Sequence, residues 1–528
     1  MTSIVLISLI HSVSCNIIAA SMSVDSSQFN LLDYFLSDER LDLIGNNTAI
    51  EFRGNRITYR QLRDDVGFWA GQILDHGIAE GDRVALLLYD SPEFIECFLA
   101  SVSLGAICVP INTFLPAGDI DFILADSGAR LIITQNELLE KLGSSAPCAV
   151  ITAETTDHPR GRHKLEDAQL CAVAATTRET PAFLLYTSGS TGAPKGVLHR
   201  HRAIPYTVKS YSQNVLRLTV DDRVFSSSRM FFAYGLGNSL SFPLAVGATV
   251  LLDTGKATAE HVAKIIMERS PTIFFGVPAV YLSLLELHKN SGHVDFSRVR
   301  LCVSAGEALP AKIFEDWKRE FGHTILDGIG STEMLHIFIS NREGQARAGS
   351  SGTVVSGYKA GLLDEGGNEV GANELGNLWV EGASATAGYW NRPELTEQTI
   401  KNGWVRTGDI YSRDGDGFFS HVGRSDDCFK VRGLWVSPIE VESVLIAHPS
   451  VSEAAVISAR DERGLATVRA YVVIRQGERD DALKEQIHKF AGSRLPPYKV
   501  PSQIEFIEEM PRTSTGKIQR YRLRAESQ

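Results

Sequence analysis

LLYTSGSTGAPKGVLHRHR, residues 184–202, is an apolar run that opens into a loop of small and hydroxyl-bearing residues. Glycines let backbone N–H groups approach an anion, hydroxyls add donors, and a lysine adds positive charge. The loop is not of the Walker A type, because Pro194 precedes the lysine and Gly196 follows it. A flexible surface turn is the alternative, but the preceding run AFLLY favours a phosphate-binding loop made of Thr187, Ser188, Gly189, Ser190, Thr191, Gly192 and Lys195.

Length and composition describe a globular chain with more than one compact unit. The 528 residues exceed the roughly 100–200 that are typical of one domain. Apolar residues make up 44% and charged residues 22%, which excludes bulk disorder. The net charge of 52 − 63 = −11 argues against sequence-blind nucleic-acid binding. The seven cysteines form no CxxC pair or zinc-like ladder, so we expect free thiols and a reducing, cytoplasmic location.

The N-terminus is apolar, but it does not fit a simple targeting segment. A secretory signal begins with basic residues, and here no Lys or Arg precedes Arg40. Polar residues interrupt the run 4–20, which weakens a membrane-spanning interpretation. We expect residues 1–22 to be an extension or the result of a misplaced start, with Met22 as the true start; a weak signal or anchor is the alternative. No later apolar run reaches the roughly 18 residues that a membrane span needs.

Apolar strands alternate with amphipathic helices along most of the chain. Residues 59–76 place their apolar side chains on one helical face, with Thr58 as N-cap and Gly77 after the last turn. A further helix is expected near 92–104, and strands are expected at 83–89, 106–112, 129–134 and 248–253. This alternation predicts an α/β fold with mostly parallel sheets covered by helices.

The residue composition changes near residue 423, where the segment GRSDDCFKVRG is polar, charged and bounded by glycines. The expected order after it is helix, strand, strand, helix and strand, at 438–448, 453–458, 467–474, 480–495 and 502–508. About 100 residues of this kind are enough for a small α+β domain. We therefore expect an N-terminal domain at 23–425 and a C-terminal domain at 426–528, with a boundary near Asp426.

Three further segments place charged residues at expected turns. Glu307 and Glu333 follow strand-like runs that end in glycine turns, and a Thr-Glu pair can hold a phosphate oxygen and Mg²⁺. Asp409 is expected in a turn, either as a plain turn residue or as an acceptor for a ribose diol. Lys517 is expected at the start of a basic helix, where an exposed terminal lysine is the alternative. Each of these signals is weak when taken alone.

Taken together and in this order, the motifs resemble the adenylate-forming superfamily of acyl- and aryl-CoA synthetases. YTSGSTGAPKG is similar to the phosphate-loop signature of that family, and GSTE, RTGD, GR-x-DD and P-x-T-x-T-GK follow at the expected intervals. The segments FFAYGLGNSLSFPLAVGA, FFGVPAVY, DGIGSTEMLHIF and VRGLWVSPIEVE look most like benzoate- and 4-hydroxybenzoate-CoA ligases. The resemblance covers about residues 30–525.

The resemblance implies a two-step ligase of aromatic acid metabolism that uses ATP, CoA and Mg²⁺. A carboxylate first attacks the α-phosphate to give acyl-AMP and pyrophosphate, and the CoA thiol then attacks the acyl-AMP after the mobile C-terminal domain has rotated. It also implies small-molecule partners only, with neither nucleic acid nor membrane, and a monomer or homodimer.

The resemblance also implies a role for individual residues. Lys195, Thr332, Glu333 and Lys517 would be catalytic, with Glu333 on the metal and Lys517 between carboxylate and α-phosphate. Nucleotide contacts outside the phosphate loop would come from Ala305, Gly306, Glu307, Asp327, Gly328, Ile329, Asp409, Arg424 and Lys430. Asp426 would be the hinge, and CoA would meet Gly433, Leu434 and Trp435. Ile329 stands where many members have an aromatic residue, so adenine would stack on an aliphatic side chain.

The implied acyl pocket is apolar and partly aromatic. It comprises Phe232, Ala233, Tyr234, Gly235, Leu236, Gly276, Val277, Ala305, Ile329, Gly330, His336 and Ile337. Tyr234 would suit a flat, short acid, and Phe232 would act as a gate. His336 either binds a ring substituent or is a core histidine with its own partners. Dicarboxylates are disfavoured, because the set contains no obvious buried cation.

Other functions stay open at this point. The same chemistry could load a separate carrier protein, or the acid could be medium-chain or alicyclic. An oxygen-dependent, luciferase-like reaction and a catalytically silent binding protein are more distant alternatives. Lys195, Glu333, Asp409 and Lys517 together argue against the silent protein.

Overall fold

The computed structural model describes residues 28–143, 148–153, 173–188, 194–292, 294–432, 434–461, 464–475, 479–512 and 518–525. The predictions for residues 1–22 lie outside these ranges. The chain divides into two compact units, Met1–Ala360 with Val380–Val405, and Gly361–Trp379 with Arg406–Gln528. The predicted hinge at Asp426 and the boundaries at 23–425 and 426–528 stay predictions.

One sheet of the first unit carries the predicted phosphate loop. Its order is β18 (Gly388–Tyr389), β8 (Pro194–Arg200), β7 (Pro181–Ser188), β4 (Ile107–Pro110), β3 (Arg83–Leu87), β5 (Leu131–Thr134) and β6 (Ala149–Thr152). The pairs from β7 to β6 are parallel, whereas β7–β8 and β8–β18 are antiparallel. Strands β3, β4 and β5 are almost wholly buried, as expected for a parallel sheet covered on both faces.

The second sheet of this unit has nine strands. Its order is β15 (Thr353–Val354), β14 (Ile337–Ser340), β13 (Ile325–Gly330), β12 (Leu301–Ser304), β11 (Ile273–Gly276), β9 (Arg223–Ser226), β10 (Thr249–Leu251), β1 (Thr48–Phe52) and β2 (Asn55–Thr58). The strands from β13 to β1 are parallel. At one end β2 pairs antiparallel with β1, and at the other end β14 and β15 continue the sheet in antiparallel pairs. The predicted α/β fold class with mostly parallel sheets is confirmed.

Helix boundaries follow local signals in the sequence. Thr58 caps α4 (Tyr59–Asp75) in a full capping box with Gln61, and Gly77 follows the helix with φ +72°. Helix α5 (Pro92–Ser103) begins with proline and is followed by Gly105 at φ +71°. The other helices of the unit are α2 (Leu31–Leu36), α3 (Asp38–Ile44), α6 (Ala117–Ser127), α7 (Ala203–Thr207), α8 (Ala233–Leu236), α9 (Phe242–Val246), α10 (Ala259–Arg269), α11 (Pro278–Ser291), α12 (Ala311–Phe321) and α13 (Pro393–Thr399), together with the 3₁₀ segment η1 (Asn136–Lys141).

Two π-helical segments interrupt the helices near the predicted acyl pocket. They are η2 (Val208–Leu216) and η3 (Gly237–Ser241), and η3 continues directly from α8. Such segments are rare and occur often at functional sites, because the wider turn re-aims side chains.

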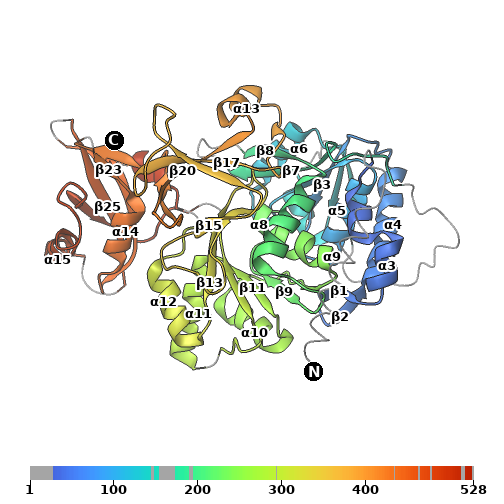
Figure 1. The fold of residues 1–528 in the computed structure, drawn as a ribbon, viewed down its shortest axis with the longest axis horizontal. Coiled ribbons are helices and arrows are strands. Elements are labelled where there is room, and N and C mark those ends of the chain that lie inside the picture. The colour runs from blue at the N-terminus through green and yellow to red at the C-terminus, as the bar shows by residue number, and fades with distance from the viewer. Residues whose placement is uncertain are drawn as a thin grey trace. The chain divides into compact units, whose positions relative to one another are not determined.

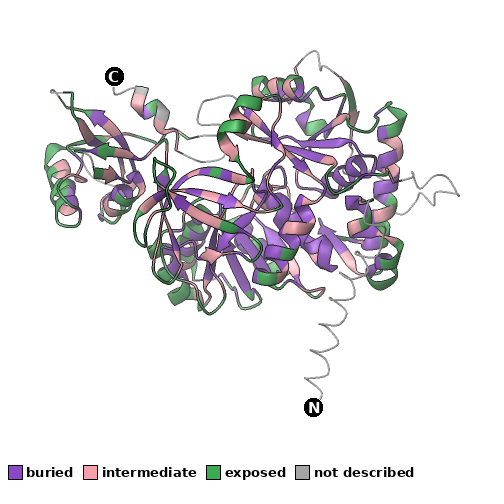
Figure 2. Ribbon diagram, turned by 45° about the horizontal axis from the view of Figure 1, so that its top comes forward, coloured by how far each residue is buried: buried purple, intermediate pink, exposed green. Residues whose placement is uncertain are grey.

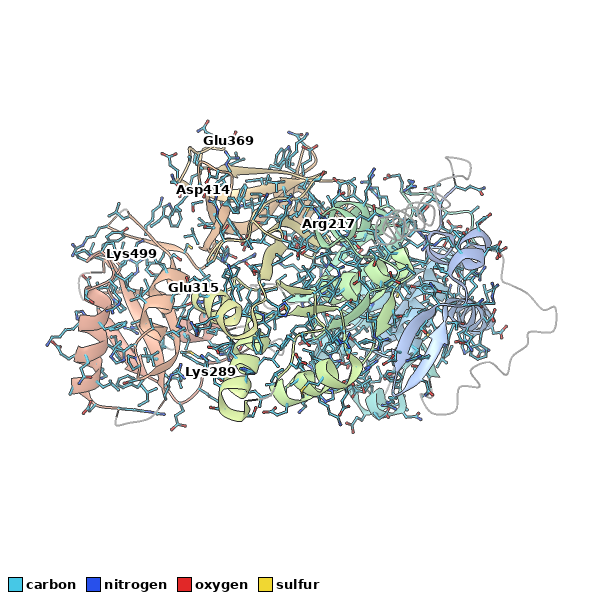
Figure 3. The ribbon with its side chains drawn as sticks, turned by 60° about the horizontal axis from the view of Figure 1, so that its bottom comes forward. Arg217, Lys289, Glu315, Glu369, Asp414 and Lys499 are labelled. Carbon is cyan, nitrogen blue, oxygen red and sulfur yellow. The ribbon has the colours of Figure 1, made fainter. Side chains whose placement is uncertain are left out.

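Helices α10, α11 and α12 cover one face of the nine-stranded sheet (Figure 1). Phe274 of β11, Tyr281 of α11 and Trp317 of α12 lie in one buried cluster. The strands of the sheets are largely buried in Figure 2, and exposed residues gather on the outer helix faces. Figure 3 labels Lys289 of α11 and Glu315 of α12, two of these exposed charges. Within the described ranges, we find no helix whose length and hydropathy would let it cross a bilayer.

The second unit is mostly β-structure. One sheet has the strand order β16 (Lys359–Leu363), β17 (Leu375–Glu381), β20 (Trp404–Arg413) and β19 (Ile400–Lys401), and β21 (Phe419–Arg424) also pairs with β20. Three of these strands, β16, β17 and β20, start or end in the first unit. Strand β19 lies wholly in the first unit. A hairpin of β22 (Phe429–Val431) and β23 (Leu434–Val436) follows. The last sheet is β24 (Val451–Arg460), β25 (Ala466–Ile474) and β26 (Gln503–Phe506), with helices α14 (Pro438–Ile446), α15 (Asp481–Gly492) and α16 (Arg520–Ala525). The predicted helix–strand–strand–helix–strand order is thus confirmed.

Candidate active site

The predicted phosphate loop joins the two strands of an antiparallel hairpin. Thr187 at the end of β7 pairs with Lys195 at the start of β8, so these two residues face each other where the loop begins and ends. A Cβ atom on Gly196 would lie 3.1 Å from side-chain atoms of both Leu184 and Tyr186, so a larger residue would crowd the hairpin. Residues Gly189, Ser190, Thr191 and Gly192, and the side chain of Ser188, lie outside the described structure.

The turn that carries Thr332 and Glu333 is held at three successive backbone carbonyls. The Thr332 oxygen lies 2.8 Å from His199 Nε2, the Glu333 oxygen accepts from Thr386 N–H at 2.8 Å, and the Met334 oxygen accepts from Ser384 Oγ at 2.8 Å. Burial lowers the pKa of His199 to about 4, so its ring is neutral near pH 7. These hydrogen bonds fix the backbone of the turn that carries the two predicted catalytic side chains, Thr332 and Glu333.

Glu333 is half-buried, and a tyrosine hydroxyl holds one of its carboxylate oxygens. Tyr389 Oη donates to Glu333 Oε1 at 2.7 Å. Within the described residues, no group of three or more His, Cys, Asp or Glu side chains could hold a metal ion. One carboxylate with a threonine hydroxyl beside it fits Mg²⁺ in its usual setting, where substrate phosphates complete the coordination. The residues therefore fit the metal that the sequence implied.

The predicted adenine side lies at the ends of β12 and β13. Ala305 is buried after β12, whereas Gly306 and Glu307 are exposed, and Gly306 has φ +91°. Asp327 lies inside β13 rather than in a turn, and burial raises its pKa well above the usual range. Its Oδ1 atom is buried without a hydrogen-bond partner in the described part of the chain. A buried acceptor of this kind suits a donor such as the amino group of adenine.

Gly328, Ile329 and Gly330 also belong to strand β13, and not to a glycine turn as expected. The strand β14 approaches so closely that a Cβ on Gly328 would lie 2.9 Å from Ile339 O, and one on Gly330 would lie 2.6 Å from His336 O. These glycines are therefore required by the strand pairing. Glu333 does lie in a turn after the strand, as predicted.

Three of the predicted acyl-pocket residues come together around one ring. Tyr234 Oη lies 3.3 Å from the carbonyl oxygens of Gly276 and Val303, and burial raises its pKa well above the usual range. Its ring centroid is 5.5 Å from that of His336. A Cβ on Gly276 would lie 2.7 Å from the Tyr281 ring, so this residue must be small. The tyrosine is thus fixed at the ends of β11 and β12.

His336 is buried with a partner that the sequence did not reveal. Its Nε2 atom lies 3.2 Å from Asn238 Oδ1, and Asn238 Nδ2 donates to Ser226 Oγ at 3.3 Å. Burial lowers the pKa of His336 to about 3, so the ring is neutral. Gly237 makes room for it, because a Cβ there would lie 2.3 Å from the imidazole. Of the two expectations for His336, this geometry agrees with a core histidine that has its own partner.

The remaining pocket residues have varied exposure. Ala233, Gly235, Leu236 and Ile337 are buried, and Phe232, Val277, Ile329 and Gly330 are half-buried. Phe232 packs edge-on against Phe231, with ring centroids 4.7 Å apart. The structure shows Phe232 in one position, so its role as a gate stays a prediction.

The predicted ribose residues lie in the second unit. Asp409 lies within strand β20 and pairs with Arg424 on β21, so its expected position in a turn is wrong. The antiparallel ladder, which the short polar motif did not reveal, extends through it. Arg424 Nη1 lies 3.1 Å and His421 Nε2 3.6 Å from Asp409 Oδ1. Burial alone would raise the pKa of Asp409, but the neighbouring His421 ring and the charge of Arg424 hold it below the usual range.

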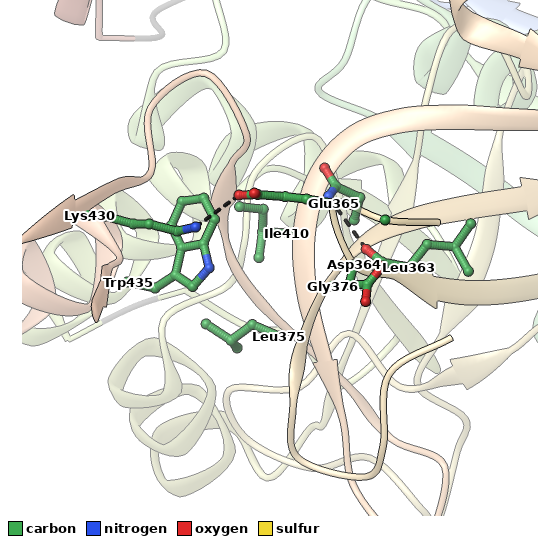
Figure 4. Close-up of a pocket in the computed structure, with 10 residues that line it drawn as sticks. Leu363, Asp364, Glu365, Leu375, Gly376, Ile410, Lys430 and Trp435 are labelled. Carbon is green, nitrogen blue, oxygen red and sulfur yellow. Dashed lines mark hydrogen bonds and ion pairs between the residues drawn. The ribbon is translucent and has the colours of Figure 1, made fainter. Parts of the chain in front are cut away.

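Trp435, predicted on the CoA side, and Lys430, predicted to contact the nucleotide, line a pocket of about 270 Å³ inside the second unit (Figure 4). Lys430 Nζ lies 2.9 Å from Glu365 Oε1 and 4.7 Å from the centroid of the Trp435 ring. Leu434 is exposed on the same hairpin. The Asp426 carbonyl accepts from Arg524 Nη2 at 3.3 Å. Gly433 and Lys517 lie outside the described residues.

Sequence reasoning missed His199, Asn238 and Tyr389. His199 is part of the quoted stretch VLHRHR, but nothing local to it indicates a partner as distant as Thr332. Asn238 follows Tyr234 by four residues, a helical spacing that could have placed it on the same side as the pocket. Tyr389 lies in the segment AGYWNRPE, which carried no recognised signal.

Comparison with known proteins gives matches along nearly the whole chain. The family model described as AMP-binding enzyme matches residues 39–390, and the AMP-binding enzyme C-terminal domain matches residues 440–517. The benzoate–CoA ligase of Thauera aromatica is 41% identical over 506 residues, which cover 92% of this chain and 95% of that protein. The 4-hydroxybenzoate–CoA/benzoate–CoA ligase of Rhodopseudomonas palustris is 37% identical over 503 residues, with 92% and 93% covered.

Solved structures agree with these matches. The crystal structure of the anthranilate CoA ligase AuaEII in complex with anthranoyl-AMP has a TM-score of 0.87 and 38% identity, with 96% of this chain and 99% of that chain covered. A benzoate CoA ligase from Burkholderia xenovorans LB400 has a TM-score of 0.85 and 37% identity, with 94% and 100% covered. The resemblance inferred from the motifs is therefore confirmed, and the chain belongs to the AMP-binding enzyme family.

Proposed function

We propose that this protein is an AMP-forming ligase that joins an aromatic carboxylic acid to coenzyme A, with consumption of ATP and with Mg²⁺. The observation that carries the substrate class is the setting of Tyr234, whose ring packs beside the neutral His336 and whose hydroxyl lies at the Gly276 carbonyl. The identity of 41% with a protein named benzoate–CoA ligase supports the same interpretation. The enzyme class follows from the family.

The first half-reaction requires two anions to meet. ATP and the carboxylate repel each other, so the site gains rate by placing positive charge and hydrogen-bond donors around them. Bound Mg²⁺ would supply charge neutralisation on the phosphates. In our proposal, Thr332 and Glu333 hold that ion and the α-phosphate. The loop between Thr187 and Lys195 would hold the outer phosphates, and the family resemblance assigns Lys517 to the reacting carboxylate.

The nucleoside contacts follow from the family resemblance, residue by residue. Asp327 would receive the adenine amino group, with Ala305 and Ile329 against the base. Asp409 would accept from the ribose hydroxyls, since its lowered pKa keeps it ionised as an acceptor. Arg424 would keep that carboxylate oriented.

The acid pocket favours a flat ring without a second charge. None of the residues assigned to it is charged near pH 7, because burial keeps His336 neutral. A second carboxylate would therefore be buried without a counter-charge, which is costly. A flexible chain would gain less than a ring from the fixed Tyr234.

In the second half-reaction, the CoA thiol attacks the acyl carbon and AMP leaves. We propose that Asp426 is the hinge for this step, and that Lys430, Gly433, Leu434 and Trp435 serve it, as the family resemblance implies. Whether the protein acts as a monomer or homodimer, and its cytoplasmic location, remain predictions.

A substrate panel tests the proposal. Pyrophosphate release and thioester formation would be measured with benzoate, hydroxy-, amino- and fluorobenzoates, cyclohexanecarboxylate and octanoate. We expect benzoate-sized acids to exceed octanoate by at least about tenfold in kcat/KM, which is about 1.4 kcal/mol and within the range of a shaped apolar pocket. A preference for octanoate would overturn the aromatic assignment and leave the ligase assignment standing.

A carrier protein stays open as the alternative acceptor, and one relative is named an AMP ligase rather than a CoA ligase. The p-hydroxybenzoic acid–AMP ligase FadD22 of Mycobacterium marinum is 34% identical over 475 residues, and this chain covers 66% of that longer protein. Replacing CoA by a phosphopantetheinylated carrier protein in the thioester assay distinguishes the two acceptors. Thioester formation with the carrier alone would favour the second one.

A further inference from the structure

The carboxylate of Glu333 is oriented by a tyrosine that comes from a different strand. Tyr389 lies in β18, opposite Val197 of β8, and its hydroxyl donates to Glu333 Oε1 at 2.7 Å. The two residues are 56 positions apart in the chain. Both residues are half-buried, so both keep some exposure to solvent.

The backbone of Glu333 does not depend on this hydroxyl. Thr386 N–H binds the Glu333 carbonyl oxygen at 2.8 Å, and Ser384 Oγ binds the Met334 carbonyl oxygen at 2.8 Å. Thr386 is in turn anchored by its Oγ1, which donates to Leu198 O at 2.7 Å. Ser384 and Thr386 therefore hold the backbone carbonyls of the turn, and the Tyr389 hydroxyl bonds the Glu333 carboxylate.

The consequence is a carboxylate with two unequal oxygens. Oε1 accepts the tyrosine proton, whereas Oε2 makes no hydrogen bond or ion pair with any described residue. Mg²⁺ has short bonds and near-octahedral geometry, and it typically takes carboxylates through one oxygen in nucleotide sites. Ca²⁺ is larger, and it accepts a carboxylate through both oxygens in a looser shell.

We propose that Tyr389 is a positioning residue that restricts Glu333 to binding the nucleotide's divalent cation through Oε2, and that it thereby biases the site towards Mg²⁺ over Ca²⁺. The inference rests on the proposed function in one respect, the assignment of Glu333 to the metal. It adds a residue that sets the selectivity of the site. Outer groups that hydrogen-bond a ligating carboxylate typically change metal affinity by about 10–100-fold when they are removed.

The test is nucleotide binding to the full chain, with no acid and no CoA present. Calorimetry with a non-hydrolysable ATP analogue gives its Kd in Mg²⁺ and in Ca²⁺ for wild type and Tyr389→Phe. This change removes one oxygen and keeps the ring, and a thermal melt checks the fold. We expect the Kd in Mg²⁺ to rise about tenfold. The Kd in Ca²⁺ should stay the same or fall, so the Mg²⁺/Ca²⁺ preference drops about tenfold or more.

Two comparisons separate positioning from a general loss of structure. Tyr206→Phe removes a hydroxyl that donates to the Gly357 carbonyl, and it should leave the metal preference unchanged. In a double-mutant cycle, Tyr389→Phe should have no further effect on Mg²⁺-supported binding once Glu333→Gln is present. Equal weakening with both metals, an unchanged preference, or additive effects in the cycle would each overturn the proposal.

Failure of the inference can be distinguished from failure of the proposed function. An unchanged metal preference together with aryl-CoA formation by the wild type would reject only the role of Tyr389. A changed preference in a protein that forms no thioester with any aromatic acid would support the role of Tyr389 and reject the assigned substrate.

Discussion

His199 Nε2 lies 2.8 Å from the carbonyl oxygen of Thr332, although 133 positions separate the two residues in the chain. A carbonyl only accepts, so Nε2 carries the proton of this neutral ring. The imidazole also stacks on Phe183, with ring centroids 5.1 Å apart. One side chain of β8, the strand after the predicted phosphate loop, thus contacts the turn that bears Thr332 and Glu333.

Loss of the hydrogen bond between His199 and Thr332 should slow the first half-reaction. His199→Phe keeps the stacking on Phe183 but cannot donate to Thr332, and a small displacement of reacting groups can lower a rate by about 10²-fold. We expect ATP–pyrophosphate exchange to fall by about 10–100-fold. His199→Gln retains an N–H donor and should recover part of the loss. Equal exchange rates in the Phe and Gln variants would contradict a positioning role for the hydrogen bond.

Acid should destabilise the protein partly through His201. Burial lowers the pKa of this residue from 6.5 to about 4. The unfolded chain therefore binds this proton below about pH 6.5, whereas the folded chain does not bind it until near pH 4. The stability from this group is complete above pH 6.5 and is lost as the pH falls towards 4, with about 2 kcal/mol gone at pH 5.

The check uses a variant that keeps the hydrogen bond but cannot titrate. His201 Nδ1 accepts from Leu31 N–H at 3.2 Å, and the side-chain amide oxygen that His201→Asn introduces can accept in the same way. Urea unfolding at pH 6.5 and 5.0 should show a loss of stability in the variant that is about 2 kcal/mol smaller than in wild type. The same pH dependence in both proteins would contradict the linkage.

Neutralising Asp409 should impair nucleotide use far more than neutralising an exposed carboxylate nearby. Asp409→Asn removes the acceptor charge beside Arg424 and is expected to raise the KM for ATP by about tenfold or more, since hydrogen bonds to charged groups are worth roughly 1.5–3 kcal/mol. Glu369→Gln breaks the surface pair with Arg413, which is 3.1 Å in length, and should change little. Figure 3 labels Glu369 in the same unit. Similar KM values for the two variants would contradict the ribose assignment.

A methyl group on Gly237 should damage the acid pocket and spare nucleotide binding. The new Cβ would lie 2.3 Å from His336 Cδ2, so the imidazole must move from its place beside Tyr234. We expect kcat/KM for benzoate to fall by about 10²-fold, with little change in the Kd of the ATP analogue. Gly71→Ala in helix α4 is the matched control, because its Cβ would meet nothing within 4 Å and should stabilise the helix by about 0.5–1 kcal/mol. Normal benzoate kinetics in Gly237→Ala would contradict the pocket assignment.

Local patterns in the sequence were sufficient to predict the main helices and strands and the family. The period of the apolar residues and the Thr58 cap placed helix α4, and the helix–strand order after residue 437 was correct. Phosphate binding was predicted from the types of residue in one short loop, since small residues and a lysine carry their chemistry wherever the chain places them. The family followed from motif order, which is also a property of the sequence alone.

Contacts between residues far apart in the chain could not be predicted from the sequence. Asp409 was expected in a turn, but its pairing with Arg424 makes it part of a ladder, because strand partners far apart in the chain are selected by packing and not by local propensity. His199 with Thr332, Tyr389 with Glu333 and Asn238 with His336 join residues 133, 56 and 98 positions apart. Contacts of this range leave no spacing pattern in one chain. The sequence therefore determined the elements, the family and the candidate chemical groups, and the packing of distant strands decided how the described groups are oriented.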